Sequence, residues 1–276
     1  MIGALAPTRV VGIDFSGARH PGKRIWVTRG TVEGATLRVE RCQRAESLPG
    51  SGIERERCLE ALRAWIAGQE WALVGMDVPF GLPAALVQEP TWERFVQAFP
   101  ARYPCPERFR EDCLGRANGR EWRRLTDVQA ATPFCVYNLR LYRQTYWALQ
   151  AIVGPLVERQ AACVLPMQPA LPGRPWLVEI CPASTLKRER RYGIPYKGGR
   201  AEHRAAREQI LAWLEGPGQV VLPPDGAQTR AVILDDAGGD ALDSLVAAYA
   251  AARLARCPDP RAASTPAFLL EGYVYT

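Results

Sequence analysis

Five carboxylates in this sequence are placed where they could do chemistry together. Asp14, Asp77 and Glu179 each lie at or near the end of a short apolar segment. A further pair, Asp240 and Asp243, lies three residues apart at the start of a helical pattern and therefore on one helical face. Clustered carboxylates repel one another unless cations lie between them, and hard cations such as Mg²⁺ or Mn²⁺ prefer oxygen ligands. Two such ions, about 3.5–4 Å apart, can activate a water molecule and stabilise the leaving oxygen of a phosphodiester.

Each of these carboxylates also has an ordinary structural explanation. Asp14 could close an Asx-turn, Asp77 could simply end a strand, and Glu179 could pair with one of the many arginines. Asp240 could be the N-cap of the last helix, with Asp243 completing a capping box. Because the acids fall at compatible ends of several elements, we favour a shared metal site over separate structural roles.

Few other side chains offer an alternative to this carboxylate chemistry. The chain has two histidines, His20 and His203, and none of its eight cysteines forms a Cys-x-x-Cys pair. A structural zinc site and a Ser-His-Asp mechanism are therefore not expected. Cys181 has no histidine near it in the sequence, so we expect a small core residue there. Asp235 and Asp236 are expected in a solvated loop upstream of the last helix, although either could be the fourth ligand.

The segments that carry these acids predict strands and helices in a definite order. Residues 9–14, 25–28 and 35–39 are short strand-forming runs that predict an antiparallel meander. Residues 53–67 have helical spacing, and residues 71–76 are almost continuously apolar, as expected of a strand buried on both faces. Further along the chain, the pattern predicts a strand at 176–178 and helices at 200–214 and 240–254.

This order predicts an α/β protein with a mixed sheet of about five strands, an antiparallel meander followed by parallel strands, flanked by helices. Parallel strands bring their carboxyl ends to one edge of a sheet, where ligands bind, so the strand-end acids converge if their strands are neighbours. The pattern matches the ribonuclease H-like architecture. We expect one domain, residues 1–276, that contains a large helical insertion at 84–170, a candidate lid or substrate clamp.

The charge of the chain is positive and unevenly distributed. The sequence has 35 basic and 29 acidic residues, a formal net charge of +6. Residues 101–150 and 183–210 both carry an excess of basic side chains, mostly arginine. Such segments suit an anionic partner such as nucleic acid, although solvated helix faces would look the same. The residues predicted to bind nucleic acid are Arg123, Arg124, Arg140, Arg143, Lys197 and Arg200, with Tyr142 or Trp147 available for base stacking.

No apolar stretch is long and uncharged enough to span a bilayer. The first residues lack the charged start and long apolar segment of a signal peptide. We therefore expect a cytoplasmic protein without a membrane partner. The sequence does not indicate its oligomeric state.

Several motifs resemble the ordered blocks of a known family, domain-of-unknown-function family 429, over roughly residues 9–255. The blocks are Val11-Gly12-Ile13-Asp14-Phe15-Ser16-Gly17, Met76-Asp77-Val78-Pro79-Phe80-Gly81-Leu82-Pro83, Val178-Glu179-Ile180-Cys181-Pro182, Tyr196-Lys197 and Asp240-Ala241-Leu242-Asp243-Ser244. The family is regarded as predicted nucleases of ribonuclease H-like fold. The resemblance implies that the strand-end acids and the pair in the last helix are metal ligands. The insertion at 84–170 departs from a minimal core of that fold.

These inferences lead to one main expectation and two alternatives. The main expectation is a divalent-metal-dependent nuclease in which Asp14, Asp77, Glu179 and the last-helix pair are catalytic and Lys197 reaches phosphate between flexible glycines. One alternative is a nucleotide-binding ATPase of the same superfold, although the chain has one Asp-x-Ser-Gly strand where such proteins usually have two. The other is a non-catalytic nucleic-acid-binding protein, whose binding would depend on salt but not on metal.

Overall fold

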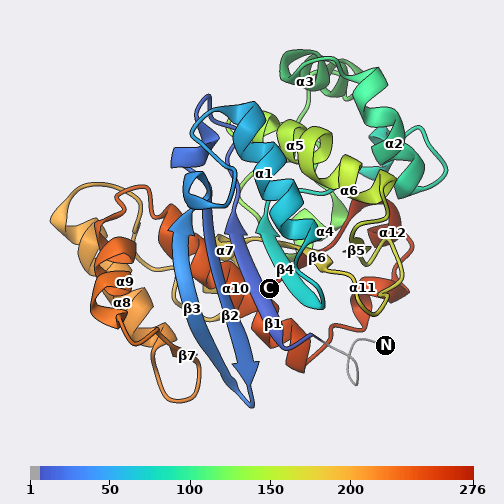
Figure 1. The fold of residues 1–276 in the computed structure, drawn as a ribbon. Coiled ribbons are helices and arrows are strands. Elements are labelled where there is room, and N and C mark those ends of the chain that lie inside the picture. Colours follow the sequence, from blue (N-terminus) through green and yellow to red (C-terminus); the bar gives the residue numbers. More distant parts are fainter. Residues whose placement is uncertain (1–6) are drawn as a thin grey trace.

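An eight-stranded mixed sheet organises the computed structural model, which describes residues 7–276 (Figure 1). The strands are β1 (Arg9–Asp14), β2 (Trp26–Glu33), β3 (Thr36–Arg44), β4 (Ala72–Asp77), β5 (Cys163–Leu165), β6 (Trp176–Ile180), β7 (Val220–Val221) and β8 (Val274–Tyr275). They lie in the order β5-β6-β4-β1-β2-β3-β7, with β8 paired to β6. β1, β2 and β3 form the predicted antiparallel meander, and β4 and β6 continue the sheet in parallel with β1.

Twelve α-helices are assigned within the described part of the chain. They are α1 (Arg55–Ala67), α2 (Trp92–Arg102), α3 (Pro106–Arg116), α4 (Leu125–Gln129), α5 (Tyr142–Ala148), α6 (Gly154–Glu158), α7 (Pro182–Arg188), α8 (Ala201–Leu214), α9 (Gly226–Asp235), α10 (Asp240–Arg256), α11 (Arg261–Ser264) and α12 (Phe268–Glu271). A π-helical turn at Leu149–Val153 joins α5 to α6. Short 3-10 turns lie at Pro21–Lys23, Ala45–Ser47 and Ala84–Leu86.

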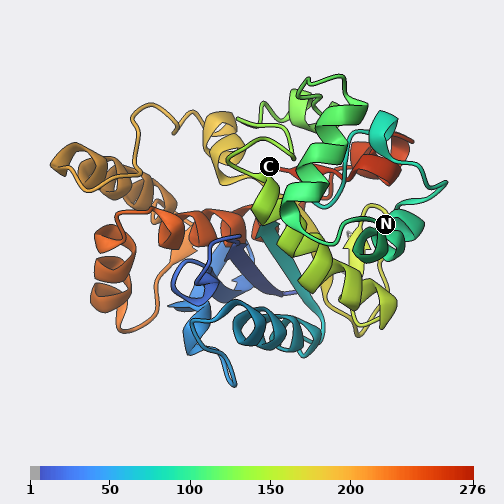
Figure 2. The same cartoon turned by 90° about the horizontal axis from the view of Figure 1, so that it is seen from above.

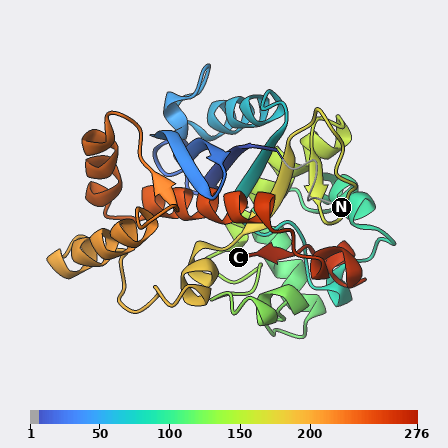
Figure 3. The same ribbon diagram turned by 90° about the horizontal axis from the view of Figure 1, so that it is seen from below.

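Helices cover both faces of the sheet. Figure 2 shows α1 on one face and α10 on the other. Strand side chains alternate between the two: Val11 and Ile13 belong to the hydrophobic cluster with α1 and the helices of the 84–170 segment, whereas Val10 belongs to the cluster with α10. In Figure 3, α8 and α9 lie beside the β3–β7 edge of the sheet.

The close packing of α10 against the sheet depends on glycine at two positions. A Cβ atom at Gly12 of β1 would clash with the backbone of Ser244 and Ala248 in α10. A Cβ at Gly75 of β4 would come within 3.0 Å of the Ala247 carbonyl oxygen. Because glycine lacks this atom, the helix can lie directly on β1 and β4, and its first turn reaches their carboxyl ends.

The sheet is larger than the predicted one of about five strands. The additional strands β5, β7 and β8 have only two or three residues each, too few for a periodic pattern to show in a sequence. The 84–170 segment contains helices α2 to α6 and strand β5. Within residues 7–276, no helix has the length and apolar character needed to cross a bilayer.

Candidate metal centre

Two of the predicted acids end neighbouring parallel strands. Asp14 is the last residue of β1 and Asp77 is the last residue of β4, and the two are register partners. Directly paired residues of adjacent strands point to the same face of a sheet. Both carboxylates therefore lie at the same edge and on the same face, the face that α10 covers.

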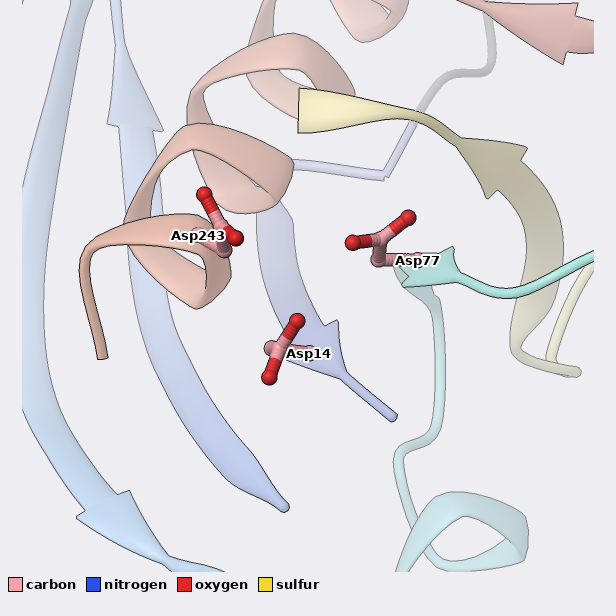
Figure 4. Close-up of side chains that lie close together, drawn as sticks. All are labelled: Asp14, Asp77 and Asp243. Atoms are coloured by element: carbon pink, nitrogen blue, oxygen red, sulfur yellow. The ribbon is translucent and has the colours of Figure 1, made fainter. Parts of the chain in front are cut away.

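The third carboxylate comes from the first turn of α10. One oxygen each of Asp14, Asp77 and Asp243 lie within 4.8 Å of one another, and Figure 4 shows the three carboxylates gathered at one site. We call these three residues the triad. Among the residues that the structure describes, no other group of three histidine, cysteine or acidic side chains is placed in this way.

Other side chains hold Asp243 in this position. Its Oδ1 accepts a hydrogen bond of 2.6 Å from the Tyr196 hydroxyl, and its Oδ2 lies 2.5 Å from the Lys197 Nζ. Burial and the negative charge of Asp243 raise the pKa of Tyr196, so this phenol remains a donor. The same negative charge raises the pKa of Lys197, which keeps its ammonium charged. Both lie in the short Tyr-Lys block that the sequence singled out.

The triad carries more negative charge than its surroundings balance. Burial, and then the charges of Asp243 and Asp77, raise the pKa of Asp14 well above its usual value. Burial, followed by the charge of Asp243, raises the pKa of Asp77 to about 7. One ammonium, that of Lys197, faces three carboxylates. Such a site gains free energy by taking up protons or a cation, and carboxylate oxygens are suitable ligands for a hard divalent ion.

Asp240 lies outside the triad, although it is only one helical turn from Asp243. It is half-buried, and burial raises its pKa to about 6 while Lys197 opposes the shift. It is also not the N-cap, because that position is Gly239, which has a left-handed backbone with φ of 74°. The Asp236 carboxylate accepts a hydrogen bond of 2.9 Å from the Ala241 amide, so this acid caps the helix and is not a fourth ligand in the triad.

Glu179 also lies outside the triad, because of strand register. It pairs with Met76 in β4, one residue before Asp77, so its side chain points to the opposite face of the sheet. There it accepts hydrogen bonds of 2.5 and 2.8 Å from Arg124 and one of 3.0 Å from the Phe80 amide. Burial raises the pKa of Glu179, and Arg124 opposes this shift. Its predicted metal-ligand role is replaced here by a buried ion pair.

Most of the residues predicted to bind nucleic acid are engaged within the protein. Arg124 is the clearest correction: it is 1% exposed and its guanidinium is paired with Asp127 and Glu179, so its charge is already neutralised within the protein. Arg123 donates to the carbonyl oxygens of Asp127 and Thr132.

The other predicted contacts divide into paired and unpaired cations. Arg143 pairs with Glu107, Arg200 pairs with Glu202, and Lys197 pairs with Asp243. Arg140 forms no ion pair with any residue between 7 and 276. The predicted stacking residues are covered too: Arg143 lies over buried Tyr142, 4.7 Å from its ring centroid, and Arg55 lies over Trp147, 4.5 Å from its ring centroid.

A cavity of about 420 Å³ opens beside the triad. Its wall includes Asp77, Asp243 and Lys197 as well as Phe134 and Arg140. Residues of the candidate metal centre and of the 84–170 segment therefore line the same cavity.

Two residues of the site were not predicted to have these roles. The Gln144 Nε2 donates a hydrogen bond of 2.6 Å to the Asp77 carbonyl oxygen, which fixes the end of β4. Nothing in the sequence distinguishes this glutamine from an ordinary polar helix residue. Tyr196 precedes Lys197, and that adjacency is a signal that could have suggested its role beside Asp243.

A family model described as "Protein of unknown function (DUF429)" matches residues 12–263, most of the chain. The match includes the triad as well as Glu179 and Lys197, and it agrees with the resemblance of the motifs. No curated protein and no solved structure matches the chain.

Proposed function

We propose that this chain, which belongs to the DUF429 family, is a divalent-metal-dependent nuclease. The observation that carries the proposal is the triad: Asp14, Asp77 and Asp243 come from three separate elements and place their oxygens within 4.8 Å of one another. A buried group of three carboxylates is costly without a cation. Their convergence at the carboxyl ends of parallel strands, beside an open cavity, favours a ligand-binding role over separate structural roles.

The strand arrangement supports placing the chain among ribonuclease H-like folds. The meander β1–β3 is followed in the sheet by parallel strands β4 and β6, with helices on both faces. This is the arrangement expected of that architecture from the sequence. On this reading, strands β5, β7 and β8 and the 84–170 segment are additions to a common core.

The residues of the triad fit Mg²⁺ or Mn²⁺. All three ligands are carboxylates, which these ions prefer. The single ammonium of Lys197 does not balance three carboxylate charges, so a bound cation would stabilise the site. When bound, such an ion would lower the pKa of water and neutralise charge on a phosphodiester. Tyr196 and Lys197 hold Asp243 in position, and Gln144 holds the end of β4. The half-exposed Lys197 ammonium also lies in the cavity wall, where it can attract a phosphate.

Cleavage assays with matched variants test this proposal. Single- and double-stranded DNA and RNA are incubated with the protein in Mg²⁺, Mn²⁺ or EDTA. We expect cleavage with the metals and none with EDTA. Asp14→Asn and Asp77→Asn should each abolish it, whereas Asp225→Asn, the same change at an exposed position far along the chain, should not.

Three outcomes would contradict the proposal. Cleavage that persists in both site variants would assign the activity to another site or to a contaminant. ATP turnover without cleavage would favour the nucleotide-binding alternative. Salt-sensitive binding to nucleic acid with no metal-dependent cleavage would favour a binding protein instead.

A further inference from the structure

The cavity beside the triad has the size of a site for one small ligand. Its volume, about 420 Å³, lies near the lower end of the range of about 300–1,000 Å³ typical of such sites. Asp77 and Asp243 lie in its wall, while Asp14 is buried and does not line it. A phosphodiester therefore approaches the triad through this cavity. A continuous duplex lying across the mouth of the cavity would not bring a phosphate to the triad.

Among the described residues that line this cavity, Arg140 is the cation without an acidic partner. Two arginines line it, and Arg124 is fully engaged with Asp127 and Glu179. Arg140 is exposed, and within the described residues 7–276 its guanidinium has no acidic partner. It lies over the ring of Phe134, 5.4 Å from the ring centroid. A cation–π contact of this kind orients the guanidinium plane without neutralising its charge.

An aromatic ring with a guanidinium stacked over it offers flat surfaces on which an unstacked base can bind. A base inside a duplex is covered on both sides by its neighbours and cannot use such a surface unless it leaves the stack. The surroundings of the cavity are apolar as well. Tyr192, which also lines the cavity, is 48% exposed. An exposed aromatic side chain in a cavity wall is available for contact with a ligand.

We propose that this cavity binds one unstacked nucleotide of a single-stranded nucleic acid. Its base lies against the Phe134–Arg140 pair, and its phosphate lies where Lys197 joins Asp77 and Asp243 in the cavity wall, with the Lys197 ammonium attracting it. The inference deepens the proposed nuclease function and rests on it. It assigns the substrate class: single strands, or nucleotides that have left a duplex stack, and not continuous duplex.

Binding in EDTA tests the inference without requiring cleavage. A fluorescein-labelled oligonucleotide is titrated with the protein, alone and annealed to its complement, and anisotropy gives both dissociation constants. We expect the wild type to bind the single strand more tightly than the duplex. Phe134→Ala and Arg140→Gln should each weaken single-strand binding by about 5- to 100-fold, as expected for losing the stacking of one base, with little change for the duplex.

Two further variants separate stacking from charge and from folding. Arg140→Lys keeps the charge but removes the guanidinium plane, so it should lose most of the single-strand affinity. Tyr192→Ala removes an exposed ring and should also weaken single-strand binding without affecting the fold. Arg41→Gln is the matched control, because Arg41 is exposed on β3 and has no ion pair in the part of the chain that the structure describes. Circular dichroism and thermal unfolding confirm that each variant is folded.

The inference is overturned if single strand and duplex bind equally, or if Phe134→Ala, Arg140→Gln and Tyr192→Ala all bind the single strand like the wild type. It is also overturned if Arg41→Gln loses as much affinity as Arg140→Gln, since binding would then depend on overall charge alone. Failure of the proposed function looks different. In that case the wild type cleaves no nucleic acid with any metal, whatever its preference in EDTA.

Discussion

Replacing Asp77 with asparagine should stabilise the metal-free protein and remove its response to Mg²⁺. Asparagine has nearly the same shape as aspartate but carries no charge. In the triad it would end the repulsion between Asp77 and its neighbours Asp14 and Asp243. It would also remove an anionic ligand that a divalent cation needs. A residue with only a structural role would not change the response to Mg²⁺.

The size of the stabilisation follows from the pKa of Asp77. Burial, and then the charge of Asp243, raises this pKa from 3.8 to about 7. Between those values the unfolded chain has lost the proton and the folded protein keeps it, so the free energy of unfolding falls as the pH rises from about 4 to about 7. One pKa unit corresponds to about 1.4 kcal/mol, which sets a ceiling of about 4 kcal/mol. Since the variant changes the side-chain hydrogen bond with Asp14, we expect a gain of about 1–3 kcal/mol at about pH 8, disappearing near pH 4.

The response to metal follows from mass action. A ligand present at about 100 times its Kd stabilises the folded state by about 2.7 kcal/mol. For a chain of this size, that corresponds to a rise in Tm of about 5–10 °C. The wild type should show this rise with Mg²⁺ at neutral pH, and Asp77→Asn should show almost none.

Urea unfolding at several pH values and thermal unfolding with Mg²⁺ or EDTA measure both effects. Asp225→Asn serves as the control, because it makes the same chemical change at an exposed position. The reasoning is refuted if Asp77→Asn is less stable than the wild type at pH 8 in EDTA, or if Mg²⁺ raises the Tm of the two proteins equally.

Three other predictions follow from the same geometry. The Kd for Mg²⁺ should fall as the pH rises from about 6 to about 8, because Asp77 must lose its proton first; calorimetry in two buffers would show the released protons, and a constant Kd would contradict this. Tyr196→Phe removes the hydrogen bond that holds Asp243 and should weaken Mg²⁺ binding by about 10-fold, so unchanged calorimetric affinity would exclude this positioning role. Arg124→Met leaves the buried acids Asp127 and Glu179 unpaired and should lower the free energy of unfolding in urea by about 3–5 kcal/mol. An equal loss in Arg123→Met, whose arginine donates to backbone carbonyl oxygens, would contradict the importance of this ion pair.

The paired strand-end acids could be predicted from the sequence because each follows an apolar run. The runs before Asp14 and Asp77 were identified as strands, and both are observed. The rule that parallel strands share a carboxyl edge then brought the two acids together. Their direct register pairing confirms that they share a face as well.

Glu179 shows where that reasoning stops. The sequence placed it near the end of β6, and the structure does so too. However, a shift of one residue in register moves a side chain to the other face of a sheet, and the sequence of one strand does not give its register against the next. An arginine partner was one of the alternatives for Glu179, but this partner, Arg124, lies 55 residues earlier in the chain and meets Glu179 only through the tertiary fold.

The choice between Asp240 and Asp243 could not be made from spacing either. Both lie on one face of the helical pattern, and only the rotation of α10 against the sheet selects Asp243. That rotation depends on the close contact at Gly12 and on the left-handed Gly239 that begins the helix. Glycines in a sequence suggest such features without saying which element approaches them.

The most direct test of a metal centre at the triad is a crystal of the protein soaked in Mn²⁺, with anomalous difference maps measured for the wild type and for Asp77→Asn. We predict an anomalous peak bounded by the carboxylate oxygens of Asp14, Asp77 and Asp243, and no such peak in the variant. A map with no peak there at saturating Mn²⁺, or one whose peak lies against Glu179 after Arg124 has moved away, would contradict the assignment.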